Sequence, residues 1–116
     1  MDYKAIAQRL VDENHYFIGV RADDRKYNVG DECELSKDWD YENDCYSDEY
    51  LDGTCATEVS NNWNDVDDVA ENLKNAIEFN KRYRSKYQYI IVGDGIERGM
   101  DENEVIIKNA VVFDVL

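Results

Sequence analysis

The sequence predicts a single small α+β domain, residues 1–116, with two helices and a mixed or antiparallel split sheet. The length of 116 residues is about the size of one ordinary domain. Two stretches carry apolar residues at helical spacing, and the other apolar stretches read as strands. The last strand-like stretches follow one another without a helix between them, which favours an α+β fold over a regular alternation of strands and helices.

Each predicted helix has an apolar stripe behind a capping residue. The first helix lies within residues 2–13, where Asp2 is placed to cap its N-terminus. The second begins after a capping Asn64 or Asp65 and is predicted to run to about Tyr83. The stripes consist of Ile6, Leu10 and Val11 in the first helix and of Val66, Val69, Ala70, Leu73, Ala76 and Ile77 in the second.

Four stretches are rich in β-branched, aromatic or small residues and are predicted to be strands. The last stretch is either one long strand or two short strands broken near Asn109. The segment GDGIERG, residues 93–99, is predicted to be a glycine-punctuated turn or loop. The predicted strands are HYFIGVR at residues 15–21, GTCATEV at 53–59, YQYIIV at 87–92 and EVIIKNAVVFDVL at 104–116.

The charge of the chain is strongly unbalanced. It has 27 acidic residues and 13 Lys and Arg, which gives a formal net charge of -14. Affinity for DNA or RNA comes mainly from basic side chains that displace counterions, so direct nucleic-acid binding is not expected. The acids are densest in residues 31–52, a predicted long loop in which ten acids accompany one base, Lys37. A basic protein surface is therefore the expected kind of partner.

Aromatic side chains lie among these acids and predict an interaction surface, because aromatic residues are frequent binding hot spots. On this hypothesis the protein is a small acidic interaction protein or inhibitor, without catalytic activity, that mimics nucleic-acid phosphates. Small acidic phage-encoded inhibitors of bacterial defence systems have this general character. The residues assigned to the partner are Asp38, Trp39, Asp40, Tyr41, Glu42 and Asp44.

No metal site is assigned from the sequence. Residues 38–49 have carboxylates at alternate positions and Glu49 at the twelfth, as calcium loops do, but Asn43 stands where such a loop has glycine. His15 is the only histidine and no CxxC pair occurs, so a structural zinc site is not expected. Thiol catalysis by Cys55 or Cys33 with His15 as the base is not expected, because acidic surroundings raise the pKa of a thiol. The three cysteines are Cys33, Cys45 and Cys55.

No apolar run approaches the roughly 20 residues that a membrane-spanning helix needs. The chain also does not open with a charged segment followed by an apolar one. We therefore expect a cytoplasmic protein with reduced thiols and no membrane association.

Three short motifs follow one another in a suggestive order. Arg21 ends the first predicted strand, GTCAT contains Thr54 and Thr57 ahead of the longest helix, and Glu102 and Glu104 form a Glu-x-Glu before the final strands. This order resembles the arginine-type branch of the ADP-ribosyltransferase superfamily. In that branch an arginine holds nicotinamide adenine dinucleotide (NAD), a Ser-Thr-Ser stretch shapes the pocket and a Glu-x-Glu supplies the catalytic carboxylate. TCAT departs from Ser-Thr-Ser at its middle positions.

The resemblance implies an ADP-ribosyltransferase-like fold that binds NAD and transfers ADP-ribose to a macromolecular target. It implies that Arg21, Thr54 and Thr57 bind the cofactor, that Glu104 is catalytic and that Glu102 positions the acceptor. A fixed carboxylate would stabilise the oxocarbenium-like ribose formed when nicotinamide leaves. The alternative is structural: Arg21 pairs with an acid, the threonines suit a strand, and the glutamates lie in a solvated turn.

Overall fold

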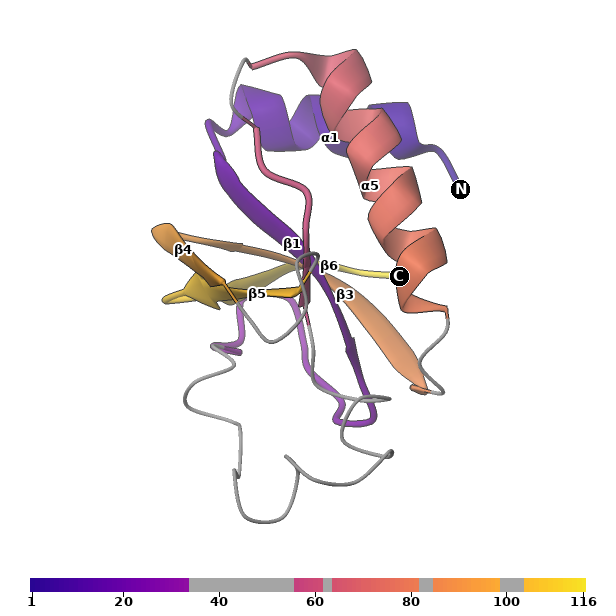
Figure 1. Ribbon diagram of the computed structural model, residues 1–116, viewed down its shortest axis with the longest axis vertical. Helices are drawn as coiled ribbons and strands as arrows, with labels where there is room; N and C mark the ends of the chain where they lie inside the picture. Colours follow the sequence, from indigo (N-terminus) through magenta and orange to yellow (C-terminus); the bar gives the residue numbers. More distant parts are fainter. Residues whose placement is uncertain (34–55, 62–63, 82–84, 99–103) are drawn as a thin grey trace.

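The computed structural model describes residues 1–33, 56–61, 64–81, 85–98 and 104–116 (Figure 1). Within these ranges the chain has an α+β fold, in which two helices pack against one face of an antiparallel sheet. The elements follow the order α1, β1, β2, α5, β3, β4, β5, β6. The predicted α+β class with two helices is confirmed, and every strand pair in the described part of the sheet is antiparallel.

The two helices are α1, Tyr3–Asp12, and α5, Val66–Asn80. Asp2 caps α1 by accepting a hydrogen bond from the backbone N–H of Ala5. Asp65 caps α5 by accepting hydrogen bonds from the first-turn backbone N–H groups. The second helix ends at Asn80 rather than near Tyr83, and the Asn80 side chain turns inward to bond the sheet.

Among the described residues the sheet has six strands, in the order β4-β5-β2-β1-β3-β6. The central strand β1 pairs with β2 on one side and with β3 on the other, so strands from distant parts of the sequence meet at the middle of the sheet. The strands are β1 Phe17–Asp23, β2 Ala56–Glu58, β3 Tyr87–Gly93, β4 Gly95–Arg98, β5 Glu104–Lys108 and β6 Val111–Val115.

Two predictions about the C-terminal half are resolved. The segment predicted as a loop at residues 93–99 contains the strand β4, which forms an antiparallel pair with β5, so the loop prediction was wrong there. The backbone groups of β4 form hydrogen bonds with β5, which follows later in the sequence. The final stretch forms two strands, and Asn109 between them has a positive φ of 52°. The alternative of two short strands broken near Asn109 is confirmed.

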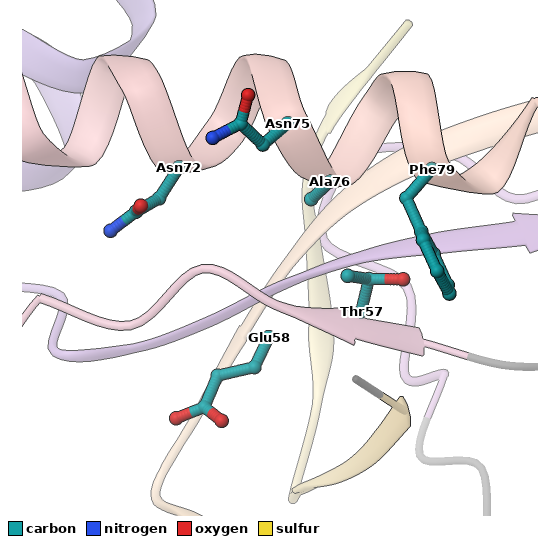
Figure 2. A pocket seen from close by; sticks show the side chains of 6 residues that line it. All are labelled: Thr57, Glu58, Asn72, Asn75, Ala76 and Phe79. Atoms are coloured by element: carbon teal, nitrogen blue, oxygen red, sulfur yellow. The ribbon is translucent and has the colours of Figure 1, made fainter. Parts of the chain in front are cut away.

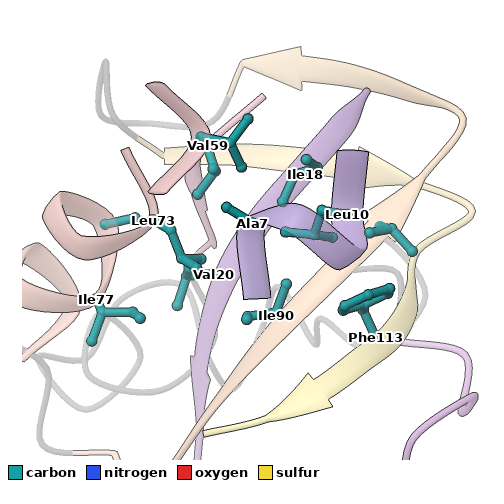
Figure 3. Packing of buried hydrophobic residues seen from close by; sticks show 12 residues of the cluster. Ala7, Leu10, Ile18, Val20, Val59, Leu73, Ile77, Ile90 and Phe113 are labelled. Atoms are coloured by element: carbon teal, nitrogen blue, oxygen red, sulfur yellow. The ribbon is translucent and has the colours of Figure 1, made fainter. Parts of the chain in front are cut away.

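Hydrophobic cores lie on both faces of the sheet because alternate strand residues point to opposite faces. The larger core lies between the sheet and the helices (Figure 3). It contains Ala7 and Leu10 from α1, Ile18 and Val20 from β1, Leu73 and Ile77 from α5, Ile90 from β3 and Phe113 from β6. The core on the opposite face consists of Cys33, Tyr89, Ile91, Ile107, Ala110 and Val112.

Residues 30–33, which follow β1, form backbone hydrogen bonds along the edge of β6. The backbone N–H of Gly30 donates to the Val112 carbonyl at 2.8 Å, and the Val112 N–H donates to the Asp31 carbonyl at 3.0 Å. The Cys33 N–H donates to the Ala110 carbonyl at 2.9 Å. The predicted acidic loop, residues 31–52, therefore starts against β6, and its remainder from residue 34 lies outside the described residues.

Candidate functional site

Arg21 lies in the interior, on the sheet face opposite the helices. Its side chain is about 1% exposed, and its Nη2 lies 2.7 Å from the Asp23 Oδ2. Its Nη1 donates a hydrogen bond to the backbone carbonyl of Cys33. The guanidinium carbon also lies 5.4 Å from the centre of the Tyr27 ring. The guanidinium thus contacts an acid, a carbonyl and an aromatic ring of its own chain.

The same region contains two groups with displaced ionisation. Burial raises the pKa of Asp23, while the charge of Arg21 and the hydrogen bond from the Arg25 N–H oppose that rise. Burial also raises the pKa of Tyr89. The Tyr89 hydroxyl donates to the Arg25 carbonyl at 2.6 Å and accepts from the Tyr27 N–H at 3.0 Å. These bonds tie the chain after β1 to the sheet.

Arg21 contacts both ends of the segment that connects Cys33 to β2. Its side chain bonds the carbonyl of Cys33, and its backbone stands opposite Ala56 in the pairing of β1 with β2. The chain between these two residues includes most of the acidic segment. Arg21 therefore contacts Cys33 and pairs with Ala56, the two described residues that flank residues 34–55.

Thr57 lies on the helix-covered face, in a polar contact between β2 and α5. The Thr57 hydroxyl donates to the Asn80 Oδ1 at 2.5 Å, and the Asn80 Nδ2 donates to the Val20 carbonyl at 2.7 Å. Since the Asn80 amide nitrogen points at a carbonyl, its oxygen must be the acceptor for Thr57. The Thr57 hydroxyl therefore donates its proton to Asn80, and its oxygen can still accept a hydrogen bond from another group.

A pocket of about 240 Å³ opens beside Thr57 (Figure 2). One wall is α5 and the other is β2, so the pocket lies at the border of the helix-covered part of the sheet. Its lining residues are mostly polar; the Thr57 side chain points towards α5, whereas the Glu58 side chain points away from α5 (Figure 2). The lining residues are Thr57, Glu58, Asn72, Asn75, Ala76 and Phe79.

The register of the sheet relates the residues predicted to form a dinucleotide site. Glu104, the first residue of β5, stands opposite Thr57 of β2. Thr57 in turn stands opposite Val20, whereas Arg21 stands opposite Ala56. Directly paired residues share a face and successive residues alternate, so the register position of Glu104 belongs to the face opposite Arg21. The fold brings Thr57 and Glu104 to adjacent positions and places Arg21 on the other face.

The remaining predicted site residues lie outside the described residues. They are Thr54 and Glu102 from the NAD assignment, and Asp38, Trp39, Asp40, Tyr41, Glu42 and Asp44 from the partner assignment. The calcium-like stretch at residues 38–49 lies in the same gap. Their assignments stay predictions from the sequence.

Sequence reasoning overlooked the α5 side of the pocket. Asn72, Ala76 and Phe79 recur at intervals of four and three residues, and therefore follow one flank of the helix. That spacing is visible in the sequence, but Asn72, Asn75 and Phe79 lie outside the apolar stripe from which the helix was predicted. Only the position of β2 alongside this flank turns it into a pocket wall.

Within the ranges that the structure describes, no three His, Cys, Asp or Glu side chains gather in an arrangement that would hold a metal ion. In the same ranges, neither helix has the length and apolar character needed to cross a membrane. Comparison with known proteins found no matching family model, no matching curated protein and no matching solved structure.

Proposed function

We propose that this protein is a small acidic interaction protein that binds a basic protein surface and competes there with nucleic acid. The observation that carries the proposal is the charge surplus. If each of the 13 Lys and Arg were paired with one of the 27 acids, 27 minus 13, or 14, carboxylates would still lack a basic partner in the chain. The electric field of these surplus carboxylates attracts a basic surface at long range and repels phosphate backbones.

Described acids on the surface support the proposal. The solvent-facing side of α5 carries exposed Asp67, Asp68, Glu71 and Glu78. The Lys4 ammonium lies 3.5 Å from the Asp67 carboxylate, but both side chains are exposed, and a pair of this kind neutralises little of the field in water. These exposed acids of α5 are therefore available to a partner, together with the acids of residues 31–52.

The test combines partner capture with matched charge removal. Candidate partners recovered with the purified protein are retested pairwise at increasing salt and in competition with duplex DNA or RNA. We expect binding to weaken steeply with salt and to be displaced by nucleic acid, because both partners would occupy one basic surface.

Two triple variants separate the acidic segment from the rest of the surface. The variant D38N/D40N/D44N removes three charges from the segment, and D67N/D68N/E71Q removes three from α5. We expect the first to weaken binding more than the second. A partner that binds independently of salt and of the first set of substitutions would contradict the proposal.

ADP-ribosyl transfer, through an ADP-ribosyltransferase-like fold, is a second candidate. The pairing of Glu104 with Thr57 beside the pocket favours it, since the resemblance assigns Glu104 to catalysis and Thr57 to cofactor binding. In the reaction, the bond between ribose and nicotinamide breaks, nicotinamide leaves, and ADP-ribose joins a nucleophile of the target. The buried contacts of Arg21 weigh against it, because a cofactor-binding arginine must reach solvent.

The measurement for this second candidate is incorporation of labelled ADP-ribose from NAD into protein targets, together with a thermal shift on adding NAD. The variant E104Q keeps the size of the side chain and removes its charge, so it should abolish labelling. Absence of both labelling and thermal shift, or labelling that E104Q leaves unchanged, would rule the enzyme out.

A further inference from the structure

We propose that Tyr16 and Phe17, at the start of β1, form an aromatic contact for arginine and lysine side chains of the basic partner. The start of β1 follows the C-terminal end of α1 at one end of the sheet (Figure 1). The inference rests on the proposed function and adds to it a surface in the described part of the chain. This surface combines exposed aromatic rings with carboxylates on a backbone that hydrogen bonds hold in place.

The two rings are open to a partner. Tyr16 and Phe17 are the most exposed aromatic side chains among the residues that the structure describes, at 45% and 39%. Phe17 stands opposite Gly93 in the pairing of β1 with β3. Gly93 has no side chain, and the Lys108 carbonyl lies too close for it to carry one. The cross-strand position on β3 therefore leaves the Phe17 ring uncovered, and exposed rings are frequent hot spots at protein interfaces.

The backbone that carries the two rings is fixed before any partner binds. The His15 N–H donates to the Leu10 carbonyl at 3.0 Å, which holds the segment against α1. The Tyr16 carbonyl accepts from the Asn61 N–H at 2.9 Å, and Phe17 pairs with β3. A partner therefore orders few groups when it covers the rings, which limits the entropic cost of binding.

Carboxylates close to the rings in the chain and in the strand register favour a cationic occupant. Glu13 ends α1 three residues before Tyr16 and is exposed. Asp94, also exposed, directly follows Gly93. Its carboxylate accepts a hydrogen bond from the uncharged Asn109 amide at 3.0 Å, so that bond leaves its charge in place. An ammonium or guanidinium is attracted to the face of an aromatic ring, and nearby carboxylates add to that attraction.

Two bases on adjoining elements are paired with other acids. Arg9 of α1 lies 2.9 Å from Asp114, and Lys108 of β5 lies 2.6 Å from Glu97. These pairs leave the carboxylates near the rings to a cation from outside. The same combination of rings and acids occurs in residues 38–44, which the sequence assigns to the partner. An arginine-rich or lysine-rich surface therefore fits the start of β1, and an acidic surface would be repelled.

The experiment is a titration of the intact, isotopically labelled protein with acetyl-hexaarginine-amide, followed by NMR. The corresponding hexacitrulline peptide is the control, because citrulline keeps the planar group without its charge. With hexaarginine we expect saturable shifts of the Tyr16 and Phe17 ring signals and of the Gly93 and Asp94 backbone amides. Hexacitrulline should cause no saturable shift.

Two variants separate the rings from the general acidic field. Y16L/F17L replaces both rings with apolar side chains and keeps every charge, whereas Y87L removes a half-buried ring at the other end of β3. We expect Y16L/F17L to weaken hexaarginine binding by about fivefold, as for exposed contacts between a cation and a ring, and Y87L to leave it unchanged. Unfolding curves show whether the variants are folded, and Y16L alone, ahead of the strand, provides the comparison if the double variant is not.

Unchanged affinity in the ring variants, an equal loss in Y87L, or shifts that bypass the two rings would overturn the aromatic contact. The proposed function would still stand in that case if a partner binds with salt sensitivity and loses affinity for D38N/D40N/D44N. If no salt-sensitive partner is recovered, the proposed function fails, while the hexaarginine titration still decides whether the rings bind arginine.

Discussion

Arg21 and Asp23 form an ion pair in the interior, beside the Cys33 carbonyl. Both side chains are almost completely buried, at 1% and 3% exposed. Taking two charges out of water is costly, and their mutual attraction together with further hydrogen bonds must offset that cost. Here the Cys33 carbonyl and the Arg25 N–H supply such bonds. The pair therefore depends on both partners being present.

Replacing Arg21 with Met should lower the free energy of unfolding by about 3–5 kcal/mol, because the substitution strands the buried Asp23 carboxylate. The double variant R21M/D23N should recover part of this loss, since it removes the second charge as well. Chemical denaturation of the wild type and the two variants at neutral pH measures both effects. A double variant no more stable than R21M would contradict this account of the pair.

The same variant should show a characteristic pH dependence. Burial already raises the pKa of Asp23, and loss of the Arg21 charge removes the first cause that lowers it. A carboxyl whose pKa is raised in the folded state destabilises the folded protein as pH rises from the pKa of the unfolded state, about 3.9, through the pKa of the folded state. The deficit of R21M relative to the wild type should therefore shrink as pH falls from 7 towards 5. In R21M/D23N this dependence should be absent.

Tyr89 gives a second residue-scale prediction. Its hydroxyl serves the Arg25 carbonyl and the Tyr27 N–H together, so Y89F leaves two backbone groups without this partner. We expect a loss of about 1–3 kcal/mol in the free energy of unfolding. The matched control is Y87F, which removes a hydroxyl from a half-buried position two residues earlier on the same strand. A similar effect from both substitutions would argue against the assigned role of the Tyr89 hydroxyl.

At the scale of elements, the close contact between the end of β3 and the end of β5 depends on Gly93. A Cβ at Gly93 would lie 2.2 Å from the Lys108 carbonyl oxygen and 2.7 Å from the Ile107 side chain. Asp94 is the single residue between β3 and β4, and its N–H donates to the same Lys108 carbonyl at 2.8 Å. The turn from β3 into β4 therefore lies directly against the end of β5.

G93A should accordingly destabilise the protein by about 3 kcal/mol, at the upper end of the range for overpacking, because a backbone atom must move. The control G95A lies two residues away, where a Cβ would meet nothing closer than the flexible Lys108 side chain at 3.8 Å. It should change the melting temperature little. Equal effects of the two substitutions would show that strand propensity, rather than the close contact, is responsible.

At the scale of the whole molecule, the net charge of -14 acts against the compact state through self-repulsion. Raising ionic strength from about 0.01 M to about 0.15 M shortens the Debye length from about 30 Å to about 8 Å. We expect the melting temperature to rise by about 4 °C over that interval, which corresponds to about 1 kcal/mol of screened repulsion. Differential scanning fluorimetry in NaCl and KCl measures it.

The choice of salt provides the control for this prediction. Screening depends on ionic strength rather than on ion identity, so NaCl and KCl should act alike. A melting temperature that stays constant or falls with added salt would contradict the repulsion argument. A much larger rise with CaCl2 at equal ionic strength would instead indicate specific binding, for which residues 38–49 are the sequence candidate.

The sequence by itself determined most of the local structure and the charge of this protein. Asp2 and the stripe of Ile6, Leu10 and Val11 predicted α1 correctly, and the change of direction at Asn109 was among the predicted alternatives. These features depend on hydrophobic periodicity and on local backbone preference, which act between residues close in sequence. The excess of acids needs no structure to be counted.

Only the tertiary structure decided which residues share a face and a site. The resemblance assigned Arg21 to the cofactor, and the alternative paired it with an acid. The register of β1 with β2 and β3 places it in a core beside Asp23, in agreement with the alternative. GDGIERG read as a loop because the partner of β4 comes later in the sequence. The pocket beside Thr57 likewise required β2 to lie along one flank of α5. Pairing register and packing are long-range choices, and a shift by one residue would exchange every one of these faces.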